Sequence, residues 1–283
     1  MANITHILVG SDLTERSRPA LHRALQLKQQ LGADMTLLHV VEPGLPPAVT
    51  ERRRQEALSV LREEINAVYR GELRRFSLDV LVGERLGTII EHAGTKGADL
   101  IVLGDTTKRR WKDLFVGTTT ERVVRHSSQP VLVVSGPGSA PYKRVLAAWD
   151  LSPGARLALG AALLIGSQAH CRIVHAWQVP LIAEFAGKKA GERVVAEESH
   201  HIRTLLDREI EEAKSRTPLR IAPEIKIVEG SPYFVIRDEM RAYQPDLLAM
   251  GTHARSSLGT ALVGSLARDL LTEASCDVLV ARP

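Results

Sequence analysis

The fold class is decided by one stretch near the end of the chain, Asp246-Leu-Leu-Ala-Met-Gly251-Thr-His-Ala254-Arg-Ser-Ser-Leu-Gly-Thr-Ala-Leu-Val-Gly264-Ser265-Leu266. Its first apolar residues, up to Met250, are typical of a short buried strand. A polar loop follows, and Gly264 and Ser265 stand where a helix is expected to begin. Glycine lets a ligand approach the backbone, and a helix N-terminus presents free N–H groups, so this arrangement can hold an anion. A turn whose glycines serve only tight packing explains the loop equally well.

The same pattern occurs a second time, in the first half of the chain. There, Ala98-Asp-Leu-Ile-Val-Leu-Gly104 leads towards Gly117, and the two glycines are separated by the same interval as Gly251 and Gly264. A helix-like segment and an apolar strand follow each loop, at residues 131–134 and 278–281. A repeat of this length indicates duplication of a whole domain.

The duplication divides the 283 residues into two domains of ordinary size, at residues 1–137 and 143–283. Between them, residues 138–142 form a short linker in a Gly- and Pro-rich stretch. The hydrophobic content of 44% and the charged content of 25% are those of a globular protein. Each half is therefore long enough to bury a core of its own.

Charge and composition argue against several classes of partner. The net charge of +4 is small, the basic residues form no stripe, and aromatic residues make up only 4%, which disfavours nucleic acid binding. No apolar run is long enough to span a membrane, and residues 4–10 resemble a strand more than a secretion signal. Cys171 and Cys276 lie in separate apolar segments and are expected to be buried free thiols, which favours a cytoplasmic protein.

Strand and helix patterns alternate along both halves. In the first half, strands are expected at residues 5–10, 35–41 and 76–82, with a helix between the first two that ends at Gly32. Asp12 or Thr14 is expected to cap that helix, and the next helix is expected to begin with Arg52. In the second half, Ser152 is expected to cap the helix that follows the first strand. The alternation predicts the α/β class, with parallel sheets covered by helices on both faces.

Ligands of such sheets bind beyond the carboxyl ends of the strands. Asp12, Val40 and Gly104 each follow or end an expected strand, so they are predicted to meet in one crevice. Asp12 and its counterpart Asp150 either contact a ligand there or cap the following helix, and the residues leave both roles open.

The chain resembles a tandem universal stress protein. The resemblance is carried in each half by an opening strand that ends in Asp12-Leu-Thr14 or Asp150-Leu-Ser152, and by the Asp-Leu run that ends at the loop glycine. It also includes strands such as 37–41 and the late Gly-Ser or Gly-Thr, and it covers nearly the whole chain. It implies two Rossmann-like domains of the adenine nucleotide α-hydrolase type, each with a five-stranded parallel sheet. It also implies that the last strands, 131–134 and 278–281, pair with each other inside one chain.

The resemblance further implies a role in the stress response and ATP as ligand. The implied nucleotide-binding residues of the second half are Asp150, Ala176, Gly251, Ala254, Gly264, Ser265 and Leu266. Those of the first half are Asp12, Val40, Gly104, Gly117, Thr118 and Thr119. ATP-binding members of the family carry a further loop glycine, which is Thr107 in the first half and Ala254 in the second. The second half is the favoured site, because Ala254 adds one methyl group whereas Thr107 is β-branched and has Asp105 nearby.

Two functions of different classes are favoured, ahead of a third, an adenine-nucleotide hydrolase of the same fold, for which no base is identified. One is a stress-response protein that binds an adenine nucleotide and acts as a sensor or switch. The other is a binding or interaction module that has the same fold but takes no nucleotide, and the incomplete glycine motif favours it. The sequence shows no catalytic constellation and no metal-ligand spacing, so at most weak ATP hydrolysis is expected. His39 and His175 are expected to be strand histidines with a satisfied hydrogen bond, and no protein partner is indicated.

Overall fold

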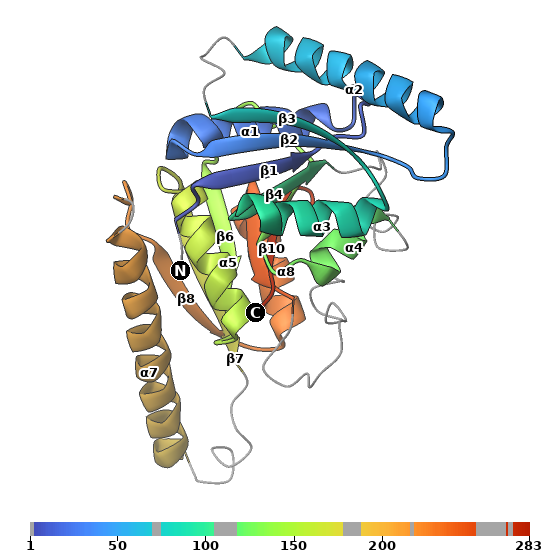
Figure 1. Ribbon diagram of the computed structural model, residues 1–283. Helices are drawn as coiled ribbons and strands as arrows, with labels where there is room; N and C mark the ends of the chain where they lie inside the picture. Colours follow the sequence, from blue (N-terminus) through green and yellow to red (C-terminus); the bar gives the residue numbers. More distant parts are fainter. Residues whose placement is uncertain are drawn as a thin grey trace.

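In the computed structural model, one ten-stranded sheet runs through both halves of the chain (Figure 1). The structure describes residues 3–69, 75–104, 118–177, 188–215, 218–252, 270 and 274–283. The strands of the first half are β1 His6–Gly10, β2 Asp34–Val41, β3 Phe76–Val82, β4 Leu100–Gly104 and β5 Val131–Val134. Those of the second half are β6 Arg144–Ala148, β7 His170–Trp177, β8 Glu224–Glu229, β9 Leu247–Gly251 and β10 Asp277–Ala281. Their order across the sheet is β3-β2-β1-β4-β5-β10-β9-β6-β7-β8.

The two halves join through their last strands. All neighbouring strands within each half are parallel, whereas β5 and β10 pair antiparallel, with Leu132 opposite Leu279. The prediction that these two strands meet is confirmed, and so is the α/β class with five parallel strands in each half. The pairing covers two strand edges that would otherwise be free to pair with other chains. The domain limits at residues 137 and 143 stay a prediction.

Helices cover both faces of the sheet, as predicted. They are α1 Arg18–Leu31, α2 Pro47–Val68, α3 Arg85–Lys96, α4 Thr119–His126, α5 Pro153–Ile165, α7 Lys188–Lys214 and α8 Pro232–Tyr243. One apolar core packs α1, α2, α5 and α7 on one face, and a second core packs α3, α4 and α8 on the other. Figure 1 shows α2 (blue) outside β3 at one edge of the sheet and α7 (gold) beside β8 at the other.

Two of the predicted helix starts were wrong. The helix α1 begins at Arg18 with Ser17 as its N-cap, because the chain first makes a turn in which the Ser17 N–H donates to the Thr14 carbonyl (3.0 Å). The helix α2 begins at Pro47, well before Arg52, and proline suits the first turn of a helix because its missing N–H would have no partner there. The predicted cap of α5 is confirmed, since Ser152 Oγ accepts from the Ala155 N–H (3.1 Å).

The two cysteines are free and buried, as predicted. Burial raises the pKa of each thiol to about 12, so both stay protonated near neutral pH. None of the helices in the described ranges has the length and apolar character needed to cross a membrane.

Candidate functional site

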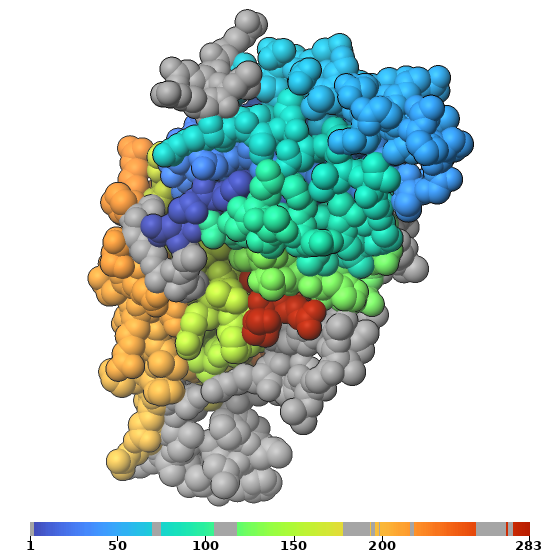
Figure 2. Space-filling view, viewed as in Figure 1, coloured from blue at the N-terminus to red at the C-terminus, as the bar shows by residue number. Residues whose placement is uncertain are grey.

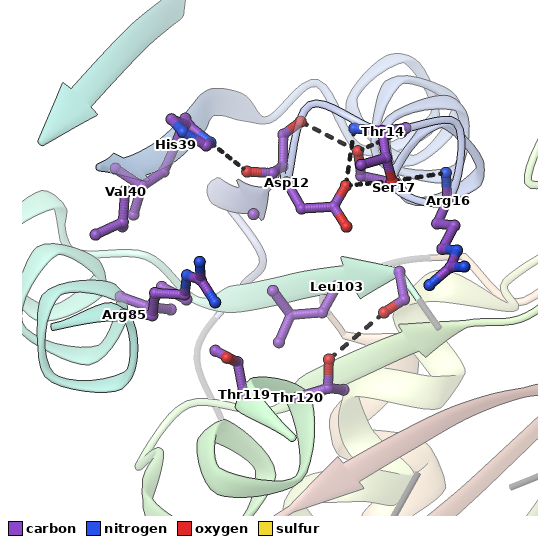
Figure 3. A pocket seen from close by; sticks show the side chains of 15 residues that line it. Asp12, Thr14, Arg16, Ser17, His39, Val40, Arg85, Leu103, Thr119 and Thr120 are labelled. Atoms are coloured by element: carbon purple, nitrogen blue, oxygen red, sulfur yellow. Dashed lines mark hydrogen bonds between the residues drawn. The ribbon is translucent and has the colours of Figure 1, made fainter. Parts of the chain in front are cut away.

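A cavity of about 330 Å³ lies beyond the carboxyl ends of β1, β2 and β4 in the first half (Figure 3). Its lining comes from these strands, from the turn before α1, and from the starts of α3 and α4. The lining residues are Gly10, Ser11, Asp12, Thr14, Arg16, Ser17, Leu38, His39, Val40, Arg85, Ile89, Leu103, Gly104, Thr119 and Thr120. Asp12, Val40 and Gly104 therefore meet at one cavity, as the strand pattern predicted.

One wall of the cavity is apolar. Leu38 and Val40 supply it from β2, Ile89 from α3 and Leu103 from β4, and all four side chains are less than one tenth exposed. Such a wall suits a flat, weakly polar group, because burying apolar surface is favourable while the remaining edge of the group can stay hydrated.

The backbone of Val40 offers polar groups at the edge of that wall. The Leu38 carbonyl accepts from the Ser11 N–H (2.9 Å), just where β1 ends at Gly10. Backbone groups of alternate residues in a strand point to the same side, so those of Val40 point past the end of β1. A donor and an acceptor in this position can recognise the edge of a nucleobase.

Asp12 shapes the turn that follows β1. Its Oδ1 accepts from the Thr14 N–H (2.9 Å) and from the Thr14 hydroxyl (2.8 Å), and its side chain lines the cavity. Asp12 therefore does not cap α1, and its carboxylate is exposed where a ligand hydroxyl could donate to it.

The N-terminus of α4 borders the cavity opposite this turn. Thr118 is the N-cap of α4 and accepts from the Glu121 N–H (3.2 Å), while Thr119 and Thr120 line the cavity. Thr120 Oγ1 donates to the carbonyl of Gly104 (3.5 Å), which ties the helix start to the end of β4. The first N–H groups and the positive end of the helix dipole therefore lie at the cavity, where they favour an anion.

Two arginines add positive charge at the cavity. Figure 3 shows Arg85 near Val40 on one side of the cavity and Arg16 on the other side, beyond Leu103 of β4. Arg85 also pairs with Glu42 (2.6 Å), and both side chains are more than half exposed. Asp12 is the single carboxylate among the fifteen lining residues, so the lining favours a negatively charged ligand.

The glycines that end β4 and β9 are required for packing. A Cβ atom on Gly104 would lie 2.7 Å from the Arg16 carbonyl oxygen, and one on Gly251 would lie 2.6 Å from the Ala155 nitrogen. In both halves the absent side chain lets the backbone near the start of the first helix approach the strand end. The packing explanation of these glycines therefore has direct support, although Gly104 also lines the cavity.

His39 and His175 each have a backbone carbonyl as the hydrogen-bond partner of Nδ1. His39 Nδ1 lies 2.9 Å from the Ser11 carbonyl, and His175 Nδ1 lies 2.7 Å from the Trp149 carbonyl. The prediction that both are strand histidines with a satisfied hydrogen bond is confirmed.

The second half repeats the backbone of the crevice. Asp150 Oδ1 accepts from the Ser152 N–H (3.0 Å), and the Trp149 N–H donates to the Val174 carbonyl (2.9 Å), so Ala176 corresponds to Val40. Gly251 ends β9. The other predicted residues of this half, Ala254, Gly264, Ser265 and Leu266, lie outside the described residues, as does Gly117 of the first half. The preference for the second half therefore stays a prediction.

Sequence reasoning missed Arg16 and Arg85. They are separated by most of the first half, and each stands just before or at the start of a helix that follows a strand. The available signal was a basic residue close to the start of a helix that follows a parallel strand, since such helix starts lie at the carboxyl edge of the sheet.

Comparisons with known proteins agree on one family. Its model, described as the universal stress protein family, matches residues 3–135 and 141–282. A universal stress protein of Mycobacterium tuberculosis H37Rv is 23% identical over 300 residues, which cover 98% of this chain and 96% of that protein. One of Mycolicibacterium smegmatis is 24% identical over 298 residues, covering 98% and 97%. The crystal structure of a universal stress protein from Archaeoglobus fulgidus has the same fold, with a TM-score of 0.69, 19% identity and 99% of each chain covered.

Proposed function

The chain belongs to the universal stress protein family, and we propose that it binds an adenine nucleotide, ATP, in the first-half cavity and acts as a sensor or switch. The observation that carries the proposal is that one cavity is lined by an apolar wall, by Val40 at a strand end, by the N-terminus of α4 and by two arginines. Few small metabolites other than nucleotides combine a flat base with a chain of anionic groups.

Each part of ATP can be matched to a group of residues that line the cavity. The base would lie against Leu38 and Ile89 with its edge at the Val40 backbone, and a ribose hydroxyl would donate to Asp12. The phosphates would lie at the N-terminus of α4, where N–H groups and Arg16 supply positive potential. The volume of about 330 Å³ is at the lower end of the range for small-molecule sites.

A second nucleotide site in the other half is a separate proposal. It would use Asp150, Ala176 and Gly251 together with Ala254, Gly264, Ser265 and Leu266. Its support is the repeated backbone turn at Asp150 and the matching position of Ala176.

Calorimetric titration of the full chain with ATP tests the two sites against each other. We expect Asp12→Asn to weaken binding about ten- to a hundredfold, because a charge-assisted hydrogen bond is worth roughly 1.5–3 kcal/mol. Asparagine keeps the Oδ1 acceptor on which the Thr14 turn depends. The matched control Asp150→Asn makes the same change in the second half and should leave first-site binding intact.

The outcomes separate the alternatives. A loss of affinity in Asp150→Asn and not in Asp12→Asn would place the nucleotide in the second half, and Ala254→Gly should then tighten it. No heat of binding in the parent at millimolar ATP would contradict the nucleotide proposal. The chain would then be a binding or interaction module that has the fold without the ligand.

A further inference from the structure

A residue of the second half contacts α4, the helix of the first half that borders the cavity. We propose that Arg282, one residue beyond β10, is a positioning residue that holds the N-terminus of α4 in place for the phosphates of the first-half nucleotide. This inference rests on the proposed function, and it assigns to that site a residue of the other half of the chain.

The position of α4 depends on its contacts with neighbouring elements. It has 8 residues, Thr119–His126, and helices this short are not stable on their own. Thr119 and Thr120 at its start line the cavity, and among the described residues Thr120 has one long hydrogen bond to another element, 3.5 Å to the Gly104 carbonyl. Contacts farther along α4 therefore have to fix where its first N–H groups lie.

Arg282 makes such a contact at the opposite end of α4. Its Nη1 donates to the Arg125 carbonyl (2.7 Å), which belongs to the last turn. Carbonyls of the last turn have no partner within the helix, and a cation there also favours the negative end of the helix dipole. In Figure 2 the C-terminal atoms (red) lie against the green surface of α4.

An ion pair within α4 links the helix end that Arg282 contacts to the helix start at the cavity. Arg125 Nη2 lies 2.6 Å from Glu121 Oε1 one turn earlier, and the Glu121 side chain is only 6% exposed. Glu121 in turn donates its N–H to the cap residue Thr118 (3.2 Å). A chain of contacts thus runs from Arg282 through Arg125 and Glu121 to the helix start at the cavity.

The equivalent position of the first half carries a different residue. Leu132 and Leu279 face each other across the β5–β10 pair, and Ser135 and Arg282 each lie three residues farther along, so they are equivalent positions. A serine side chain is too short to cap a helix as Arg282 does. The opposite end of β10 holds α1, because the carboxylate of Asp277, the first residue of that strand, pairs with Arg23 (3.2 Å). Both elements that flank the phosphate end of the first cavity are thus tied to β10.

The test measures ATP and adenosine affinity by calorimetry in the full-length parent, in Arg282→Gln and in Arg282→Lys. We expect Arg282→Gln to weaken ATP about two- to fivefold, the usual size of a helix-terminus charge contact, and to leave adenosine unchanged. Lysine keeps a cation and a donor, so Arg282→Lys should recover most of the ATP affinity. The control Arg193→Gln removes the same charge from an exposed position on α7 and should change neither ligand.

Hydrogen exchange of the α4 amides is measured in the same proteins without ligand, and faster exchange is expected in Arg282→Gln alone. Equal losses for ATP and adenosine would show a general structural role and overturn the inference, as would unchanged ATP affinity. If the parent binds neither ligand, the proposed function has failed. Unchanged α4 exchange would overturn the positioning role whether or not the parent binds ATP.

Discussion

The two crevices of this chain have the same backbone and different charges. Gly104 approaches Arg16 in the first half, and Gly251 approaches Gly154 in the second. The helix that follows the edge strand begins with Arg85 in the first half and with Pro232 in the second. Both arginines of the first cavity are therefore absent at the equivalent positions. The duplicated core fixes where a ligand can bind, while residues at helix starts, which the core does not require, decide which charge it meets.

A second comparison concerns the ion pair between each edge strand and the helix behind it. Asp79 of β3 pairs with His92 (2.6 Å) and Lys96 (3.0 Å) of α3. At the equivalent place in β8, Lys226 pairs with Glu239 of α8 (2.9 Å). The same strand–helix contact is made with the charges exchanged, so this contact depends on complementarity and not on a particular residue.

The largest difference between the halves is expected at their junction. The buried Asp277 carboxylate accepts from Arg23, from the Tyr142 hydroxyl (2.7 Å) and from the N–H groups of Ser135 and Gly136. Removing one partner of a buried pair typically costs about 3–5 kcal/mol, so Asp277→Ala should lower the unfolding free energy by that amount in urea.

Pro130 stands at the equivalent position of the first half, one residue before β5, and Pro130→Ala should cost under about 1 kcal/mol. Equal losses in the two variants would show that the junction is symmetric after all. Adding Arg23→Met to Asp277→Ala should recover part of the loss, because the buried arginine is then no longer left without its partner.

A smaller and equal effect is expected at the two strand-end glycines. Gly104→Ala and Gly251→Ala should each destabilise the protein by about 1–3 kcal/mol, because the added Cβ meets backbone atoms that cannot rotate away. The control Gly94→Ala, in an open position of α3, should stabilise by up to about 1 kcal/mol. Thermal unfolding of the three variants checks this prediction. If Gly104→Ala left the stability unchanged, the two strand-end glycines would not be equivalent.

The smallest expected effect is the pH dependence of the Asp79 contact. Burial alone would raise the pKa of Asp79, but hydrogen bonds from Lys96 and His92 hold that pKa below its usual value. A carboxyl whose pKa is lower in the folded state stabilises above its unfolded pKa, and this contribution disappears as the pH falls through the folded value. Asp79→Asn should therefore cost about 0.2–1 kcal/mol near neutral pH and nothing in strong acid. A cost that persists at the acid end of a urea series would contradict this origin.

The sequence was sufficient for the sheet and insufficient for the charges of the site. Apolar periodicity and the repeat predicted the strands, and the family resemblance predicted the β5–β10 pair. The prediction that Asp12 caps α1 was wrong, because its carboxylate accepts hydrogen bonds from Thr14 in the turn before the helix. The sequence alone could not show that Arg16 and Arg85 line the same cavity, because only the strand order β2-β1-β4 brings them together.

The antiparallel β5–β10 pair at the centre of the sheet also affects how mutations can accumulate in the two halves. Were the halves separate identical chains joined by this pair, every mutation would occur on both sides of the axis. A contact such as Arg23 with Asp277 would then need both residues in both copies, and Pro130 could not occupy the position equivalent to Asp277. In this single chain each half inherits its mutations alone. Arg282 on one side and Ser135 on the other are a difference that only such a fused pair can accumulate.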